Sequence, residues 1–276
     1  MRPIEDTVIL ITGATDGLGR GVAERLAAEG ATVLLHGRDP ERLAATADAV
    51  RQATGNERLS THRADLASLE EVRALADHVE RSTDRLHVLI NNAGIGSGRP
   101  DGTTRQESRD GHELRFAVNY LAGFLLTERL LPLLRRSAPA RIVHVASLGQ
   151  APIDFDDVML RDGYSGTRAY SQSKLAQIEY GFELADRLDA SEVTVNSLHP
   201  STYMPTKMVL EERGSSVDSL EAGVDATVRL AIAPELEGVT GRFFDRQTES
   251  GAHPQAYDAE ARRRLSELSR QLTGAS

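Results

Sequence analysis

The stretch Thr7-Val8-Ile9-Leu10-Ile11 runs directly into Thr12-Gly13-Ala14-Thr15-Asp16-Gly17-Leu18-Gly19, and this passage decides the fold. Residues 7–11 are almost entirely apolar, as expected of a parallel strand that is buried on both faces. Apolar residues then recur with helical spacing at Leu18, Val22 and Leu26 until a glycine ends the pattern. A strand, a glycine-rich turn and a helix in this order predict the first unit of a dinucleotide-binding α/β fold.

The glycine-rich turn is the first candidate binding site. Backbone N–H groups at a helix N-terminus can hold a phosphate when glycines let the chain turn tightly. The spacing is G-x-x-x-G-x-G and not the better-known G-x-G-x-x-G, so a tight turn that binds nothing is the alternative. We predict dinucleotide binding, with these residues of the turn in contact with the cofactor: Thr12, Gly13, Thr15, Asp16, Gly17, Leu18 and Gly19.

Strand and helix patterns continue to alternate along the chain. Strands are predicted at 31–38, 59–63, 86–90, 141–147, 193–198 and 242–244. Helices are predicted at 41–53, from 68 onward, and at 109–136, 168–189, 221–233 and 258–272. This alternation predicts one Rossmann-type, doubly wound α/β domain over residues 1–276, with a parallel sheet flanked by helices. Pro132 lies inside the long helix 109–136 and is expected to kink or break its last turn.

Composition narrows the function. A net charge of −9 and a pI near 5.4 argue against nucleic acid as a partner. The chain has no cysteine, which excludes disulfides and thiolate nucleophiles, and no His/Asp/Glu spacing indicates a metal site. Neither a run of about 18 apolar residues nor a signal-like N-terminus is present, so we expect a cytoplasmic protein without a membrane anchor.

The end of the second strand bears on which dinucleotide is bound. It closes with Gly37-Arg38, and an Arg at this place accommodates the extra phosphate of NADP, whereas an acid would bond the ribose of NAD. Asp39 follows, but Asp39-Pro40-Glu41 is typical of a helix N-cap with proline at the first helical position. We therefore predict NADP(H), with NAD(H) as the less favoured alternative. Arg20 and His36 are either helpers in binding this phosphate or, as such residues more often are, surface residues.

Polar residues follow two further strands. Asp65-Leu66 comes after the third strand, where Asp65 either accepts a bond from the adenine amino group or only forms a turn. The fourth strand leads into Asn91-Asn92-Ala93-Gly94, which is either a simple strand-ending turn or a place where side-chain amides tie neighbouring strands together beneath the cofactor. We include Asp65, Leu66, Asn92, Ala93 and Gly94 among the predicted cofactor-binding residues.

Tyr170 and Lys174 form the candidate reaction centre. They are four residues apart and so share one face of a helix. A cation beside a phenol favours the phenolate, so the pair can exchange a proton near neutral pH. Only two of the 32 basic residues are lysines, Lys174 and Lys207, although a chance solvated lysine is the alternative explanation. Ser147, at the end of the fifth strand, and Asn119, within the long helix, are further candidates.

Together these motifs resemble the short-chain dehydrogenase/reductase family, over nearly the whole chain. Thr12-Gly13-x-x-x-Gly17-x-Gly19, Asn91-Asn92-Ala93-Gly94 and Tyr170-x-x-x-Lys174 stand in the family's order, with Asp65-Leu66, Asn119 and Ser147 between them. Arg38-Asp39 and Ala169-Tyr170-x-Gln172-Ser173-Lys174-Leu175-Ala176 are similar to the retinol-dehydrogenase-like branch, of which this sequence looks like a soluble member.

The resemblance implies a role for each site residue. Tyr170 would be the proton donor in reduction and the base in oxidation, and Lys174 would hold the nicotinamide ribose and lower the pKa of Tyr170. Ser147 would bond the substrate oxygen, and Asn119 would position a water between Lys174 and solvent. The backbone at Pro200 would hold the nicotinamide carboxamide, and Thr202 would compensate for Ser201, which stands where the family usually has glycine.

The sequence thus predicts an NADP(H)-dependent oxidoreductase that interconverts a ketone or aldehyde and an alcohol. The alternative is a non-catalytic NADP(H)-binding regulator on the same fold. Loops at 96–108, 148–169 and 201–220 are the expected substrate walls. Their apolar residues favour an apolar substrate or are ordinary loop anchors: Pro152, Ile153, Phe155, Tyr164, Tyr203, Met204 and Met208. The resemblance also implies a homodimer or homotetramer paired through the helices at 109–136 and 168–189.

Overall fold

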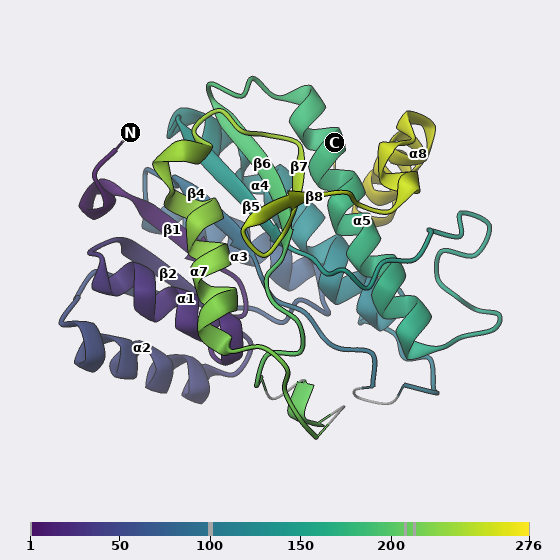
Figure 1. Ribbon diagram of the computed structural model, residues 1–276, viewed down its shortest axis with the longest axis horizontal. Helices are drawn as coiled ribbons and strands as arrows, with labels where there is room; N and C mark the ends of the chain where they lie inside the picture. The colour runs from purple at the N-terminus through teal and green to yellow at the C-terminus, as the bar shows by residue number, and fades with distance from the viewer. Residues whose placement is uncertain (1, 99–101, 207–208, 212–213, 276) are drawn as a thin grey trace.

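The computed structural model describes residues 2–98, 102–206, 209–211 and 214–275, and it is built around one sheet with helices on both faces (Figure 1). The strand order is β3-β2-β1-β4-β5-β6-β7-β8. Neighbouring strands are parallel except for β7 and β8, which are antiparallel. The strands are β1 Val8–Ile11, β2 Thr32–Gly37, β3 Leu59–Arg63, β4 Val88–Asn91, β5 Ala140–Val145, β6 Val193–His199, β7 Arg242–Asp245 and β8 Thr248–Ser250.

The central strand β1 supplies side chains to both helix layers. Ile9 and Ile11 pack into the core on one face of the sheet, and Leu10 packs into the core on the other. All three are fully buried, which explains why this strand is continuously apolar and not alternating. Strand order reverses between β1 and β4, and open α/β sheets bind ligands in the crevice at such a point, beyond the carboxyl ends of the strands.

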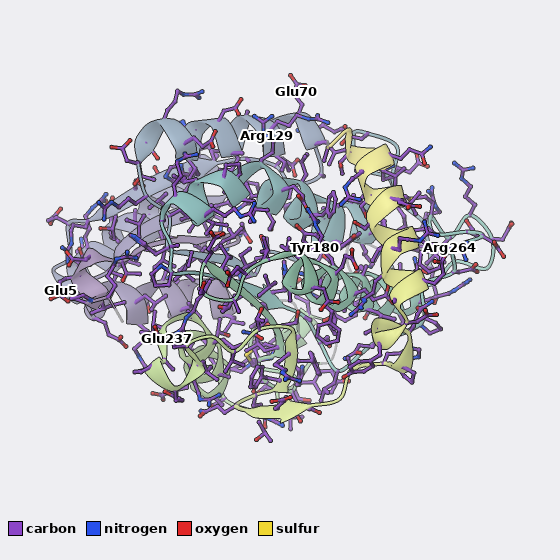
Figure 2. The ribbon with its side chains drawn as sticks, turned by 90° about the horizontal axis from the view of Figure 1, so that it is seen from above. Glu5, Glu70, Arg129, Tyr180, Glu237 and Arg264 are labelled. Atoms are coloured by element: carbon purple, nitrogen blue, oxygen red, sulfur yellow. The ribbon has the colours of Figure 1, made fainter. Side chains whose placement is uncertain are left out.

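Two helix layers cover the sheet. One layer holds α1 (Gly17–Ala28), α2 (Pro40–Thr54) and α7 (Leu220–Ile232). The other holds α3 (Leu69–Ser82), α4 (Ala122–Arg136) and α5 (Gly166–Arg187). The π-helical turn η2 (Phe116–Leu121) leads directly into α4. The last helix, α8 (Ala259–Thr273), packs against α5. Figure 2 shows α8 at the edge of the molecule, with Tyr180 of α5 in the interior.

The predicted fold class is confirmed, but the long helix begins later than expected. Residues 109–113 form a turn, and helix begins only after Glu113. Gly111 has a left-handed φ of +78°, and the Asp110 carboxylate accepts a hydrogen bond from the N–H of Leu69. The Glu113 carboxylate then caps the helix by accepting from the N–H of Phe116 at 2.7 Å. Side-chain capping therefore overrides the apolar periodicity that extended the prediction to residue 109.

Pro132 does not break its helix. Residues Ala122–Arg136 form one helix with Pro132 inside it, flanked by the buried side chains of Leu131 and Leu133. Tertiary packing thus outweighs the lost backbone hydrogen bond. The segment Phe116–Arg136 is also long and apolar enough to cross a membrane by length and composition, which the search for an apolar run missed. Because 72% of that window is buried inside the fold, core packing accounts for its apolar character.

Candidate active site

The glycine-rich turn is held in a conformation that needs glycine. Gly13 has a φ of +67°, in the left-handed region that side chains rarely adopt. A methyl group on Gly19 would collide with the carbonyl oxygen of Gly13 and lie 2.5 Å from Asn92 Nδ2. Asp16 caps α1 by accepting from the N–H of Gly17 at 2.8 Å. The first N–H groups of an α-helix lack intrahelical partners, and here the N–H of Arg20 is the first to bond back, to the carbonyl oxygen of Asp16 at 3.2 Å, so this helix N-terminus can receive an anion.

Asn92 ties β4 to β1 directly beneath the turn. Its side-chain Nδ2 donates to the carbonyl oxygens of Thr12 at 2.8 Å and Gly13 at 3.2 Å. In return, Thr12 Oγ1 accepts from the N–H groups of Asn92 and Ala93, each at 3.0 Å. Of the two interpretations of this segment, the one in which side-chain amides tie neighbouring strands together holds. The join fixes the crevice at which the strand order reverses.

His36 is a buried support of the same turn and not a surface residue, which corrects the sequence prediction. Its Nδ1 accepts from the N–H of Gly13 at 3.1 Å, and its Nε2 lies 3.1 Å from the carbonyl oxygen of Ala64. Burial lowers the pKa of His36 to about 4, so the ring is neutral near pH 7. With Nε2 protonated, one imidazole connects β1, β2 and the end of β3. A polar residue in an apolar strand was the only sequence signal of this role.

At the end of β2, Arg38 is exposed, and its guanidinium forms no hydrogen bond or ion pair within the described part of the chain. Asp39 caps α2 by accepting from the N–H groups of Glu41 and Arg42, each at 3.0 Å, which confirms its predicted capping role. The carboxylate of Asp16 pairs with Arg42 at 3.0 Å. Arg38 is therefore the cation available to a phosphate at this place.

Asp65 forms a turn, which was one of the two interpretations offered for it. Its Oδ1 accepts from the N–H of Ala67 at 3.0 Å, and its Oδ2 lies 3.5 Å from Arg109 Nη2. Leu66 is buried in the core beside it. Contact of Asp65 and Leu66 with an adenine stays a prediction.

Tyr170 and Lys174 lie one turn apart on α5, which Ser165 caps by accepting from the N–H of Arg168 at 3.1 Å. Lys174 Nζ lies 5.7 Å from the centroid of the Tyr170 ring. It donates to the carbonyl oxygen of Val145 and to Oε1 of Gln177, both at 2.9 Å. An ammonium has three N–H donors, so one is left for a further acceptor. Burial lowers the pKa of Lys174 to about 7.

Gln177 is a site residue that the sequence analysis missed. It lies three positions after Lys174, on the same helix face, and that spacing was the available signal. Its amide oxygen accepts from the buried ammonium, and the side chain borders a cavity of about 10 Å³ between Asn91 and Asn119. That volume is about the space for one water molecule.

Ser147 follows β5 and lies beside Tyr170. A methyl group placed on Gly149 would lie 3.4 Å from Ser147 Oγ and 3.7 Å from Tyr170 Cε1, so both side chains border one point in space. Ser147 Oγ accepts from the N–H of Gly149 at 3.0 Å. Its hydroxyl hydrogen therefore remains available to another acceptor.

Asn119 joins the same group from the π-helical turn η2. Its Oδ1 accepts from the N–H of Ile95 at 2.8 Å, and its Nδ2 donates to Ser173 Oγ at 3.0 Å. A methyl group on Gly94 would lie 3.2 Å from Asn119 Oδ1 and 3.6 Å from Lys174 Nζ. The structure thus brings all four predicted catalytic residues to the carboxyl edge of β4 and β5.

The chain after β6 reaches this edge through Pro200, Ser201 and Thr202. Thr202 Oγ1 lies 3.1 Å from His199 Nε2 and 3.1 Å from Arg246 Nη2, so its hydroxyl already has two protein partners. Farther on, Thr206 reaches the glycine-rich turn, because a methyl group on Gly17 would lie 2.9 Å from Thr206 Cγ2. Lys207 and Met208, expected in this loop, lie outside the described residues.

Several predicted substrate-wall residues turn out to be loop anchors. Ile153 and Met204 are buried, and Tyr164 Oη accepts from Arg115 Nη1 at 2.6 Å. Tyr203 is 43% exposed and remains open to solvent. The alternative interpretation as loop anchors therefore holds for Ile153, Met204 and Tyr164. These three residues give correspondingly less support to an apolar substrate.

The family can be stated with this geometry in hand. The sequence profile of the family described as short chain dehydrogenase matches residues 7–215. The chain belongs to that family. Mouse retinol dehydrogenase 13 is 37% identical over 98% of this chain and 85% of its own length. Mouse polyprenol dehydrogenase is 36% identical over 99% of this chain and 85% of its own length. The chain is thus a retinol-dehydrogenase-like member of the short-chain dehydrogenases.

Solved structures of this family agree. A protein of Mycobacterium paratuberculosis superposes with a TM-score of 0.77 at 29% identity, covering 98% of this chain and 94% of that one. A short-chain dehydrogenase of Shigella flexneri, solved in complex with NADP, gives a TM-score of 0.71 at 28% identity, covering 88% and 97%. The family uses nicotinamide cofactors, and the residues at this sheet edge fit one: an open helix N-terminus, an Arg38 that forms no ion pair with any described residue, and a Lys174 with one N–H donor left over.

Proposed function

We propose that this short-chain dehydrogenase interconverts an apolar ketone or aldehyde and the corresponding alcohol, with NADP(H) as its cofactor. The observation that carries the proposal is the convergence of Ser147, Tyr170 and Lys174 at the carboxyl edge of the sheet, beside the glycine-rich turn. The cofactor supplies or accepts the hydride. The chain itself binds, orients and moves a proton.

In this mechanism each side chain has one task. The Ser147 hydroxyl donates a hydrogen bond to the substrate oxygen and stabilises the negative charge that develops there. The Tyr170 hydroxyl gives a proton to that oxygen in reduction and takes one in oxidation. The Lys174 ammonium stabilises the phenolate electrostatically. Val145 and Gln177 hold the ammonium from behind, which leaves one N–H for a ribose hydroxyl.

NADP(H) is favoured over NAD(H) by Arg38. Its exposed guanidinium follows β2 and is suited to a phosphate on the adenosine ribose. Asp39, the acid that would favour NAD(H), uses its carboxylate to cap α2. We assign the remaining predicted contacts to Thr12, Thr15, Leu18, Ala93 and Pro200 on the same edge of the sheet.

Retinol and polyprenol dehydrogenases among the relatives support an apolar alcohol or aldehyde as the substrate class.

We also propose pairing of two or four copies, although α8 already covers part of α5. Light scattering tests the pairing, and a monomeric mass would contradict it.

The decisive experiment follows NADPH absorbance with a panel of apolar ketones and aldehydes. Tyr170→Phe should lower kcat by about 10²–10⁴-fold, the usual contribution of a positioned acid, and leave NADPH affinity unchanged. Tyr257→Phe is the matched control, because Tyr257 is 57% exposed and lies on η4 (Pro254–Tyr257). Equal turnover by wild type and Tyr170→Phe would contradict the role of Tyr170. Tight NADPH binding without turnover of any panel member would favour the non-catalytic regulator.

A further inference from the structure

Four hydrogen bonds converge on a single carboxylate oxygen, Oδ2 of Asp218. The N–H of Thr202 donates to it at 2.8 Å, and Ser201 Oγ donates at 3.1 Å. Arg246 donates from Nη2 at 2.6 Å and from Nε at 3.2 Å. These donors come from the loop after β6 and from the turn between β7 and β8, so Asp218 joins segments that are distant in sequence.

The same place closes the loop after β6 on itself through its backbone. The N–H of Asp218 donates to the carbonyl oxygen of Thr202 at 3.1 Å, and the N–H of Val217 donates to that of Tyr203 at 3.0 Å. The N–H of Arg246 donates to the carbonyl oxygen of His199 at 2.7 Å, at the end of β6. The loop therefore leaves and returns at one fixed point on the sheet edge.

Backbone strain marks this point as well. Three non-glycine residues have a positive φ in the described part of the chain, and two of them belong to this network: Tyr203 at +46° and Arg246 at +55°. Left-handed backbone is unfavourable for such residues and persists only where surrounding contacts impose it. The hydrogen bond to Arg246 lowers the pKa of Asp218 to about 2, so the pair is charged at neutral pH.

We infer that Asp218 and Arg246 are positioning residues for the nicotinamide end of the cofactor site. The inference rests on the proposed function, in which Pro200, at the start of the same loop, contacts the cofactor. Thr202 is held through its N–H, its carbonyl oxygen and its hydroxyl, all by Asp218, Arg246 or His199. Thr206, farther along the same loop, touches the glycine-rich turn.

The inference also explains Ser201, which stands where the family usually has glycine. Its side chain adds a hydrogen bond to Asp218. The loop is thus restrained by a side-chain clamp, with Asp218 as the common acceptor and Arg246 as the common donor. Both residues act through the position of Ser201 and Thr202, which they contact directly.

The test measures binding and does not require a known substrate. In Arg246→Ala and Asp218→Asn, NADPH affinity, followed by nicotinamide fluorescence, should fall about tenfold, as expected when charge-assisted hydrogen bonds are lost. Affinity for adenosine 2′,5′-bisphosphate, which lacks the nicotinamide end, should be unchanged. Amide hydrogen exchange at Val217 and Asp218 should accelerate, and Arg246→Lys should recover part of the loss.

Arg242→Ala is the matched control, because Arg242 pairs at 3.5 Å with Glu249 across the same two strands and both side chains are more than half exposed. It should alter neither ligand's affinity. Equal weakening of NADPH and of the bisphosphate in Arg246→Ala, or no change in either, would overturn the inference. A wild-type protein that binds neither ligand would instead contradict the proposed function itself.

Discussion

The two sides of the sheet edge are built differently. On the β1–β2 side, the nucleotide region is shaped by a continuous turn of backbone, residues 12–19, supported by Asn92 and His36. On the β5–β6 side, the reaction region depends on groups from separate segments, such as Lys174 with Val145 and Asp218 with Arg246. Backbone geometry is encoded locally, whereas side-chain convergence depends on how distant segments pack.

The largest expected effect tests the backbone side. Gly19→Ala should weaken both NADPH and adenosine 2′,5′-bisphosphate by about 100-fold or more, because its methyl group would collide with the Gly13 carbonyl and displace Asn92. Isothermal titration calorimetry measures both affinities. Gly251→Ala is the control, since a methyl group there would meet no described residue within 4 Å other than its chain neighbours. Retained affinity in Gly19→Ala would show that the turn tolerates a side chain.

A buried carboxylate on α5 tests whether the packing of side chains in this part of the molecule lowers the free energy of unfolding. Glu179 on α5 is fully buried, and neither carboxylate oxygen has a hydrogen-bond partner among the residues that the structure describes. Burial raises its pKa from 4.5 to about 8. Between these values the folded chain holds a proton that the unfolded chain has released, so the free energy of unfolding falls as pH rises through this window.

Glu179→Gln should remove this pH dependence. We expect the free energy of unfolding at pH 8 to rise by on the order of a few kcal/mol, with little change at pH 5. Thermal unfolding from pH 5 to pH 8 measures it. Glu183→Gln is the control, one helical turn later on α5 and only partly buried. A Glu179→Gln curve parallel to that of wild type would show that Glu179 is ionised in the fold.

The preference for NADPH over NADH is a property of the nucleotide region, and we propose that it depends on the exposed side chain of Arg38. Arg38→Ala should reduce the preference for NADPH over NADH by about tenfold, because a charge-assisted contact to the phosphate is lost. Titration with each cofactor measures the ratio. Arg51→Ala is the control on α2, where Arg51 pairs with Asp48. An unchanged ratio would assign the phosphate to another residue.

The smallest expected effect concerns a proton on Lys174. Its pKa is lowered to about 7 by burial, so most of the ammonium is deprotonated at pH 8 in the free protein. An anionic cofactor favours the charged form and should draw in a fraction of a proton on binding. Calorimetry in two buffers of different ionisation enthalpy measures this uptake. Lys174→Met should abolish it, and uptake that persists in that variant would come from another group.

Much of the fold was predictable, because strand and helix periods are local signals. The predicted strand at residues 59–63 matches β3, and Asp39 caps α2 as its pattern indicated. The missed strand β8 is short, polar and mostly exposed, so it carries no apolar signal. The early start assigned to the long helix failed because the Glu113 cap depends on one side-chain hydrogen bond.

By itself, the sequence determined the succession of strands and helices, the glycine-rich turn and the order of the family motifs, because each depends on residues near one another in the chain. Only the tertiary structure decided that His36 supports the turn, that the carbonyl oxygen of Val145 holds Lys174 and that Arg246 meets Asp218. These pairings depend on where the strands end relative to one another and to their helices. That placement results from packing over the whole sheet, which no local pattern records.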